Sequence, residues 1–213
     1  MNRIIKITEY VIGVDEVGLG ALAGPLVVCA LATPRGWRGL PGLDDSKEVN
    51  EADRKRLSTM LWTLIVRKHS FATIVRIDSK RIDEEGVGRV HRRAIEEVIK
   101  DLMRHLRSRR KLVADVIVDG NLNFSHVHPR VRSVVKADGK FNCVRGASIL
   151  AKVFRDREME KLGEAFPLYG FEKHKGYPTK EHYAALDQHG PGEHHRYSYG
   201  PVRSRMKNDR AKE

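Results

Sequence analysis

Residues 11–20 read VIGVDEVGLG, and residues 23–32 read AGPLVVCALA. The apolar, mostly β-branched run from Val11 to Val14 predicts a buried strand that ends at Asp15. A turn signal, Gly24-Pro25, then precedes the apolar run from Leu26 to Ala32, which predicts a second strand. The first strand therefore delivers an acidic pair, Asp15 and Glu16, to its carboxyl end.

Strands and helices alternate along the rest of the chain. Apolar runs predict strands over Phe71–Ile77, Val113–Val118 and Val131–Val135. Apolar residues at helical spacing predict the helices, which run from an Asn50 cap to about Val66, from Val87 to Leu106, from Val144 to Leu162, and briefly after Thr179. This order indicates an α/β fold. We expect one catalytic domain over residues 1–213, with a core to about residue 165, an extension from about 166, and a polar tail from Arg203.

The chain is strongly basic, with 40 Lys and Arg against 28 Asp and Glu and a formal net charge of +12. Such a charge favours a polyanionic partner, nucleic acid before membrane. A merely well-solvated basic surface is the alternative. The two cysteines form no CxxC pair and indicate neither a disulfide framework nor a zinc site. The longest apolar stretch, Ala21–Ala32, is too short to span a bilayer. We therefore expect a cytoplasmic protein without a membrane partner.

Four carboxylates follow predicted strands. Asp15 and Glu16 end the first, Asp119 ends the strand from Val113, and Asp138 follows the run to Val135. Acids gathered at neighbouring strand ends repel one another unless cations balance them, and Mg²⁺ or Mn²⁺ prefers such oxygen ligands. Two such ions about 4 Å apart activate water at a phosphodiester. Turn capping or pairing with Lys and Arg is the better interpretation of any single acid, but we favour metal binding for three strand ends together.

Glycines surround the acidic pair in the order Gly18, Gly20 and Gly24. Their spacing is not GxGxxG, no GKS or GKT follows, and Pro25 opens another apolar run, so the pattern argues against a dinucleotide site. Glycines here let backbone amides approach a bulky ligand closely.

The predicted helix around residues 89–111 carries nine Lys and Arg against three acids. A solvated outer face is the usual explanation of such a run, and contact with phosphate is the alternative. Four histidines lack a set of cysteine partners, so we interpret them as surface residues or substrate contacts rather than zinc ligands: His126, His128, His194 and His195.

The segment Gly13-Val14-Asp15-Glu16-Val17-Gly18-Leu19-Gly20, with Ala23-Gly24-Pro25 behind it, resembles the opening motif of ribonuclease HII. Later segments match the family in the same order, and the resemblance spans about residues 11–198. These segments are Asp45-Ser46-Lys47, Asp119-Gly120-Asn121, Lys136-Ala137-Asp138, the run from Ala147 to Asp156, Tyr169-Gly170-Phe171, and the run from His174 to His182.

The resemblance implies a ribonuclease H-like fold, a five-stranded mixed sheet flanked by helices with a helical C-terminal part. It implies a two-metal Mg²⁺ or Mn²⁺ site on Asp15, Glu16, Asp119 and Asp138. Asp156 is the rival for the fourth position, and we interpret it as structural. The implied activity is endonucleolytic cleavage of RNA in RNA–DNA hybrids, and at ribonucleotides within duplex DNA, leaving a 3′-hydroxyl and a 5′-phosphate. We expect a monomer.

In this family the glycine motif and a tyrosine read the ribose 2′-OH, which distinguishes RNA from DNA. These roles fall on Gly18, Leu19, Gly20 and Tyr177, although ordinary packing is the alternative for the tyrosine. Further substrate contacts are expected in the matching segments, at Ser46, Lys47, Asn121 and Lys175.

Two departures from the family pattern stand out. Leu19 replaces the usual Arg or Lys between the glycines, and Arg145-Gly146 replaces small apolar residues. The missing cation at Leu19 leaves open a second function, nucleic-acid binding without catalysis. A related nuclease of the resolvase or integrase kind is a third.

Overall fold

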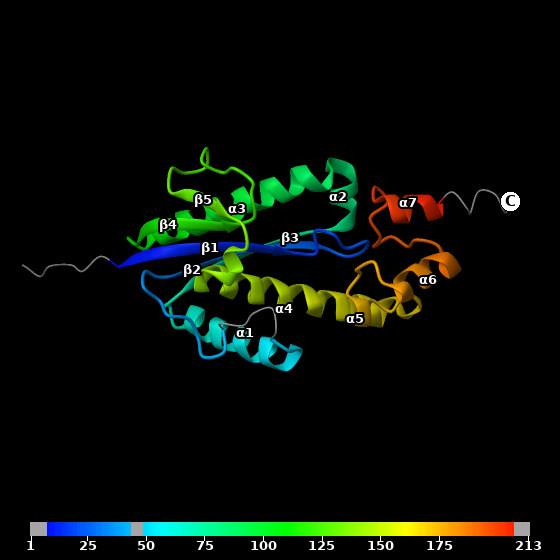
Figure 1. Ribbon diagram of the computed structural model, residues 1–213, viewed down its shortest axis with the longest axis horizontal. Helices are drawn as coiled ribbons and strands as arrows, with labels where there is room; N and C mark the ends of the chain where they lie inside the picture. The colour runs from blue at the N-terminus through cyan, green and yellow to red at the C-terminus, as the bar shows by residue number, and fades with distance from the viewer. Residues whose placement is uncertain (1–7, 44–48, 207–213) are drawn as a thin grey trace, which may run out of the picture. The chain divides into compact units, whose positions relative to one another are not determined.

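The computed structural model describes residues 8–43 and 49–206 (Figure 1). Five strands form one mixed sheet in the order β3-β2-β1-β4-β5, which confirms the predicted sheet. Their bounds are β1 Glu9–Val17, β2 Leu26–Pro34, β3 Phe71–Ile77, β4 Leu112–Asp119 and β5 Val131–Val134. The first two strands are longer than predicted, because the pairing extends beyond their apolar runs.

Helices separate and follow the strands. Their bounds are α1 Glu51–Val66, α2 Ser79–Glu85, α3 Val87–Ser108, α4 Asn142–Ala165, α5 Phe171–His174, α6 Lys180–His189 and α7 Gly200–Met206, with short 3₁₀ turns at Ala137–Gly139 and Pro167–Tyr169. The sequence predicted α1, α3, α4 and α6 but missed α2, α5 and α7. The polar segment expected from Arg203 is helical as far as Met206, the last described residue.

The chain folds into two compact units that divide several elements between them. Unit 1 combines the residues up to Glu16 with Val28–Val75 and Ala94–Val153. Unit 2 combines Val17–Val27, Arg76–Arg93 and the residues from Phe154 onward. The single catalytic domain expected from the sequence stays a prediction.

In unit 1, β4 runs parallel to both β1 and β5, with Val14 opposite Val118 and Asp119 opposite Val134. Parallel strands bring their carboxyl ends to the same edge of a sheet. The register therefore fixes the ends of β1 and β4, which carry the predicted acids, side by side.

Two glycines allow α4 to lie close to the sheet of unit 1. A Cβ on Gly13 of β1 would stand 2.3 Å from the backbone carbon of Cys143. A Cβ on Gly146 of α4 would stand 2.4 Å from Leu31 of β2. At Gly146, a departure from the family pattern, the neighbour is the far end of the Leu31 side chain, so a larger residue there needs that side chain to shift. In this unit α1 and α4 lie on one side of the sheet and α3 on the other (Figure 1).

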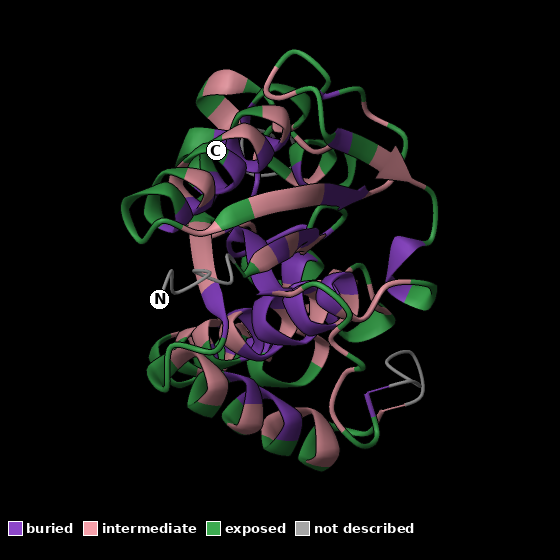
Figure 2. Cartoon of the chain, turned by 90° about the vertical axis from the view of Figure 1, so that its left-hand side faces the viewer, coloured by how far each residue is buried: buried purple, intermediate pink, exposed green. Residues whose placement is uncertain are grey.

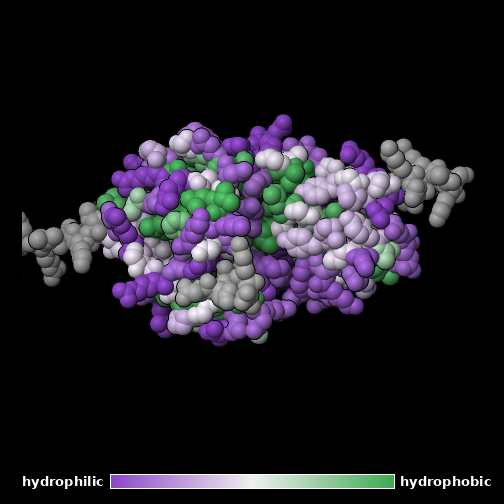
Figure 3. All heavy atoms as spheres, in the orientation of Figure 1, coloured by the Kyte–Doolittle hydropathy of each residue, from purple (hydrophilic) through white to green (hydrophobic). Residues whose placement is uncertain are grey.

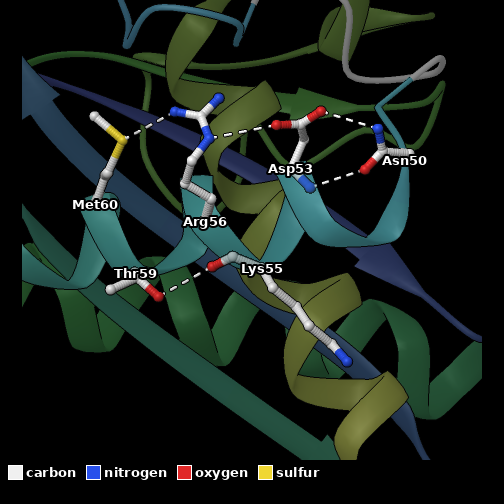
Figure 4. A network of polar contacts seen from close by, with 6 residues as sticks. All are labelled: Asn50, Asp53, Lys55, Arg56, Thr59 and Met60. Atoms are coloured by element: carbon white, nitrogen blue, oxygen red, sulfur yellow. Dashed lines mark hydrogen bonds and ion pairs between the residues drawn. The ribbon is translucent and has the colours of Figure 1, made fainter.

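Helix α1 begins where the sequence predicted. The Asn50 side chain accepts a hydrogen bond from the Asp53 amide at 2.9 Å, and its own amide group donates to the Asp53 carboxylate (Figure 4). Such a cap satisfies one of the amides that have no partner within the helix. Leu57 and Leu61 are buried as expected, whereas Leu64 is only partly buried.

The predicted apolar stripe of α3 is confirmed, since Val90, Ala94, Ile95, Val98 and Leu102 are all buried. Figure 2 shows buried residues concentrated in the strands and on the inner faces of the helices.

Unit 2 contains a buried histidine pair, and one of the two, His195, had been expected at the surface. His182 and His195 are buried, with their Nε2 atoms 3.1 Å apart. Burial lowers the pKa of each to about 4. The expectation that His195 is a surface or substrate-side residue is therefore wrong, because it packs against Tyr169 and Phe171.

Within residues 8–43 and 49–206, none of the helices combines the length and apolarity needed to cross a bilayer. Hydrophilic residues cover most of the face seen in Figure 3, with separate hydrophobic areas between them.

Candidate active site

Three of the four predicted acids occupy the last residues of two adjacent parallel strands in unit 1. Asp15 and Glu16 lie near the end of β1, and Asp119 is the last residue of β4. The charges of Glu16 and Asp119 both act on Asp15. The structure thus brings together the acids that the sequence placed on separate strands.

Asp15 is the most deeply buried of these acids, with 7% of its surface exposed. One carboxylate oxygen accepts the Glu16 amide at 2.8 Å, and the side chain also bonds to Ser148 of α4. Burial raises the pKa of Asp15 to about 7, and the negative charges of Glu16 and Asp119 add to that rise. With this pKa, the carboxyl group is about half ionised at neutral pH, and its ionised form is the one that binds a cation.

Asp119 and Asp138 are connected through one short turn. The Asp119 carboxylate accepts the Ala137 amide at 2.6 Å, and Asp138 is the next residue, in the 3₁₀ turn Ala137–Gly139. Asp138 is buried, with 9% exposed. The hydrogen bond therefore ties the turn that carries the fourth predicted acid to the end of β4.

Among the described residues, no three His, Cys, Asp or Glu side chains stand in an arrangement that holds a metal ion. Asp15 and Asp119 each direct an oxygen to a backbone amide. The chemistry of the donors still fits a divalent ion, because clustered, partly desolvated carboxylates are the ligands that Mg²⁺ and Mn²⁺ prefer. Metal binding at this edge requires these carboxylates to turn toward one another.

The glycine motif lies in unit 2 and is held by Tyr177. The Gly18 amide donates to the Tyr177 hydroxyl at 3.2 Å. Gly18 has φ +89°, and a Cβ there would stand 2.3 Å from Nε of Arg155, so a larger residue is excluded. The predicted association of the glycine motif with Tyr177 is therefore present within this unit.

Arg155 forms the base of this arrangement and is fully buried. Its guanidinium donates to the carbonyls of Pro25 at 2.8 Å, Lys175 at 2.8 Å and Ala23 at 3.1 Å. It also lies 5.1 Å from the centre of the Tyr177 ring. One buried cation thus joins the glycine segment to the segment that carries the tyrosine.

A second buried arginine, Arg196, fixes the carbonyls of the motif. It donates to Leu19 O at 3.1 Å and to Gly24 O at 2.9 and 3.2 Å. The Tyr199 hydroxyl donates to the same Leu19 carbonyl at 2.7 Å. With its carbonyl held, the Leu19 backbone is oriented, while its side chain is 38% exposed.

The other predicted substrate contacts have different positions. Asn121 is exposed just after β4. Lys175 directs its ammonium to Glu160 at 3.0 Å and to the Glu172 carbonyl at 2.7 Å. Ser46 and Lys47 lie outside the described residues. Substrate contact by all four stays a prediction.

Asp156, the rival for the fourth acid position, lies in unit 2. It is buried, and its charge partly offsets the desolvation that lowers the pKa of the neighbouring Arg155 to about 10. This contact is consistent with the structural role expected for it.

Sequence reasoning missed Ser148, Arg155, Arg196 and Tyr199. Ser148 lies at helical spacing between buried residues of α4, a position that signals packing rather than a hydrogen bond to an acid. Buried arginines have no pattern that separates them from surface ones, in a chain with 40 Lys and Arg. Their carbonyl partners are up to 177 residues away.

A mixed sheet with clustered acids at the ends of two adjacent parallel strands is the arrangement of a ribonuclease H-like, carboxylate-dependent nuclease. The family model of ribonuclease HII matches residues 12–202, and the chain belongs to that family. A ribonuclease HII of Bacillus cytotoxicus is 37% identical over 94% of this chain and 72% of its own length. One of Bacillus anthracis is 36% identical over 93% of this chain and 72% of its own.

A solved structure supports the same family. Ribonuclease HII from Archaeoglobus fulgidus, solved in a complex with PCNA, has a TM-score of 0.68 at 25% identity and covers 87% of this chain and 91% of its own. The chain is accordingly an enzyme, a hydrolase of the ribonuclease H type. Its family comprises divalent-metal-dependent endonucleases that cut the RNA of RNA–DNA hybrids.

Proposed function

We propose that this enzyme also incises duplex DNA at embedded ribonucleotides and leaves a 3′-hydroxyl and a 5′-phosphate. Asp15, Glu16, Asp119 and Asp138 would hold two Mg²⁺ or Mn²⁺ ions. The observation that carries the proposed metal site is the environment of Asp15. It is a buried strand-end acid whose pKa is raised to about 7 beside Glu16 and Asp119. A cation relieves both the desolvation and the repulsion that raise this pKa.

When bound, two divalent ions supply an activated water and stabilise the charge that develops on the phosphodiester oxygens. The protein's own part begins with Asp15, which would hold an ion in its ionised form, with its proton released to solvent. Ser148 and the Glu16 amide hold the Asp15 carboxyl group in place. Asp119 holds the Asp138 turn through the Ala137 amide. These bonds limit the freedom of the acids and lower the entropic cost of binding ions.

Recognition of RNA is proposed for the glycine motif and Tyr177. The Tyr177 hydroxyl accepts the Gly18 amide, and the Tyr177 ring lies on buried Arg155, so the ring has a fixed position. Gly18 follows Glu16 by two residues in the sequence, which ties this motif covalently to the acids. A fixed ring and close backbone amides suit a 2′-OH, which both donates and accepts hydrogen bonds.

A matched pair of variants tests the acid site. Asp119→Asn removes a proposed ligand, whereas Asp115→Asn removes an acid of the same strand that pairs with Arg132 at 2.8 Å. We expect Asp119→Asn to lose at least two powers of ten in hybrid cleavage with either ion, and Asp115→Asn to stay within a few-fold of wild type. Near-normal turnover of Asp119→Asn, or undiminished cleavage by wild type in excess EDTA, would contradict the proposed site.

Leu19 motivates a second candidate, a protein that binds hybrids without cleaving them. The exposed Leu19 side chain offers no charged group to a phosphate, unlike the Arg or Lys expected there. Binding without cleavage by the wild-type protein, under both metal conditions, would favour this candidate.

A further inference from the structure

One cavity among the described residues lies in unit 1, away from the acids. It measures about 630 Å³ and is lined by α3, the start of β4 and the loop before β5. The lining residues are Lys100, Met103, Arg104, Arg107, Lys111, Leu112, Val113, Val127, His128 and Arg130. Five are Lys or Arg, and none is Asp or Glu.

The cations form two walls around an apolar floor. Lys100, Arg104 and Arg107 follow one another at intervals of four and three residues, which places them on one face of α3 over about 10 Å of helix. Arg130 supplies the facing wall, and its guanidinium is directed by a bond to the Val113 carbonyl at 2.5 Å. Phosphates of one DNA strand lie about 3.4 Å apart along the helix axis, so a row of this length faces more than one phosphate.

Ion pairing leaves much of this charge available. Lys100 pairs with Glu96 at 3.1 Å and Arg104 with Asp101 at 2.9 Å, both at exposed positions. Exposed pairs of this kind stabilise a protein only weakly, so a phosphate competes for either cation. Arg107, Lys111 and Arg130 form no ion pair with any residue of the described ranges.

Helix stabilisation explains only part of the pattern. Arg107 lies in the last turn of α3, where a cation favours the helix dipole. That effect is confined to the last turn, and it accounts neither for Lys100 nor for Arg130 across the cavity.

We propose that this cationic groove binds one phosphodiester strand of a nucleic acid, at a site separate from the acid edge. Asp119 lies six residues beyond Val113 along β4, which corresponds to about 20 Å between the groove and the acid. Cations on both walls bind the phosphates, and the apolar floor of Met103, Leu112 and Val127 contacts sugars or bases. The groove thus gives the enzyme a second hold on nucleic acid that does not depend on its metal site.

The test measures binding of a fluorescent 12-nucleotide oligothymidylate by anisotropy, in EDTA, between 50 and 300 mM KCl. This DNA probe contains no RNA to cleave. Arg107→Gln/Lys111→Gln removes two groove cations, and Arg67→Gln/Lys80→Gln removes two exposed cations that do not line it. Each lost phosphate contact lowers the salt slope by about 0.7, so we expect a drop of about 1.4 in the groove variant and about tenfold weaker binding. The control variant should match wild type.

Equal losses in both variants, or none in either, would overturn the proposal, because net charge alone or another surface would then bind the strand. Displacement of the oligonucleotide by equimolar AMP would also overturn it, since one phosphate would then suffice. The single variant Arg107→Gln should show about half the change in slope, which guards against misfolding of the double variant. The kcat for hybrid cleavage at saturating substrate depends on the acid site and not on the groove, so failure of this proposal is distinguishable from failure of the acid site.

Discussion

Replacing Asp15 with asparagine is expected to stabilise the metal-free protein, although it removes a proposed metal ligand. Asp15 ionises near pH 3.8 when unfolded and near pH 7 in the folded protein. Between these values the folded state keeps a proton that the unfolded state has lost. The wild-type protein therefore loses stability as pH rises from about 4 to about 7, and the loss is complete above pH 7.

The size of the effect follows from the raised pKa. A rise of about three pH units corresponds to about 4 kcal/mol as an upper limit, since one unit is about 1.36 kcal/mol. Relaxation and water entry reduce this, and we expect about 2 kcal/mol for Asp15→Asn at pH 8. For a chain of this length, that is a rise in Tm of about 4–8 °C. At pH 4 the two proteins should differ little.

The assay is thermal unfolding in EDTA at pH 4, 6 and 8, followed by circular dichroism. Asp115→Asn is the control, because its carboxylate pairs with Arg132 and its removal should lower stability slightly. Added Mn²⁺ should then raise the Tm of wild type but not of Asp15→Asn, since a ligand stabilises only the state that binds it. An Asp15→Asn protein less stable than wild type at pH 8 in EDTA would refute the argument from burial and repulsion.

Three further predictions concern unit 2. Leu19→Arg should raise the ratio of single-ribonucleotide incision to continuous-hybrid cleavage by about one to two powers of ten, because one charge-assisted hydrogen bond contributes about that much. An unchanged ratio in gel assays would exclude a role for position 19 in recognising single ribonucleotides. Tyr199→Phe removes the donor to the Leu19 carbonyl and should raise KM for the hybrid about fivefold with little change in kcat, as steady-state kinetics would show. Because the His182–His195 pair is buried in its uncharged form, the Tm of wild type should fall as pH drops from 6.5 toward 4. His195→Gln should make the Tm depend less on pH in a melting series, and the same dependence in both proteins would contradict this prediction.

Much of the fold was predictable because local signals agree with the tertiary structure. The Asn50 cap, the stripe of α3 and the Thr179 cap of α6 each depend on neighbours within a few residues. Helix α2 was missed because its seven residues, SKRIDEE, have only one large apolar side chain, buried Ile82. Its position depends on contacts with distant residues, such as the bonds from Tyr197 and Ser198 to Asp83.

The sequence by itself determined the alternation of strands and helices, the acids at the strand ends and the ribonuclease HII family, because these features reside in short, ordered motifs. Only the tertiary structure decided which acids meet, through the parallel register of β1 and β4. It alone placed His195, Arg155 and Arg196 in the interior. From a sequence, charged and polar side chains are expected at the surface, because burying them without partners is unfavourable. Here folding brings distant carbonyls and rings next to them, and these partners make their burial favourable.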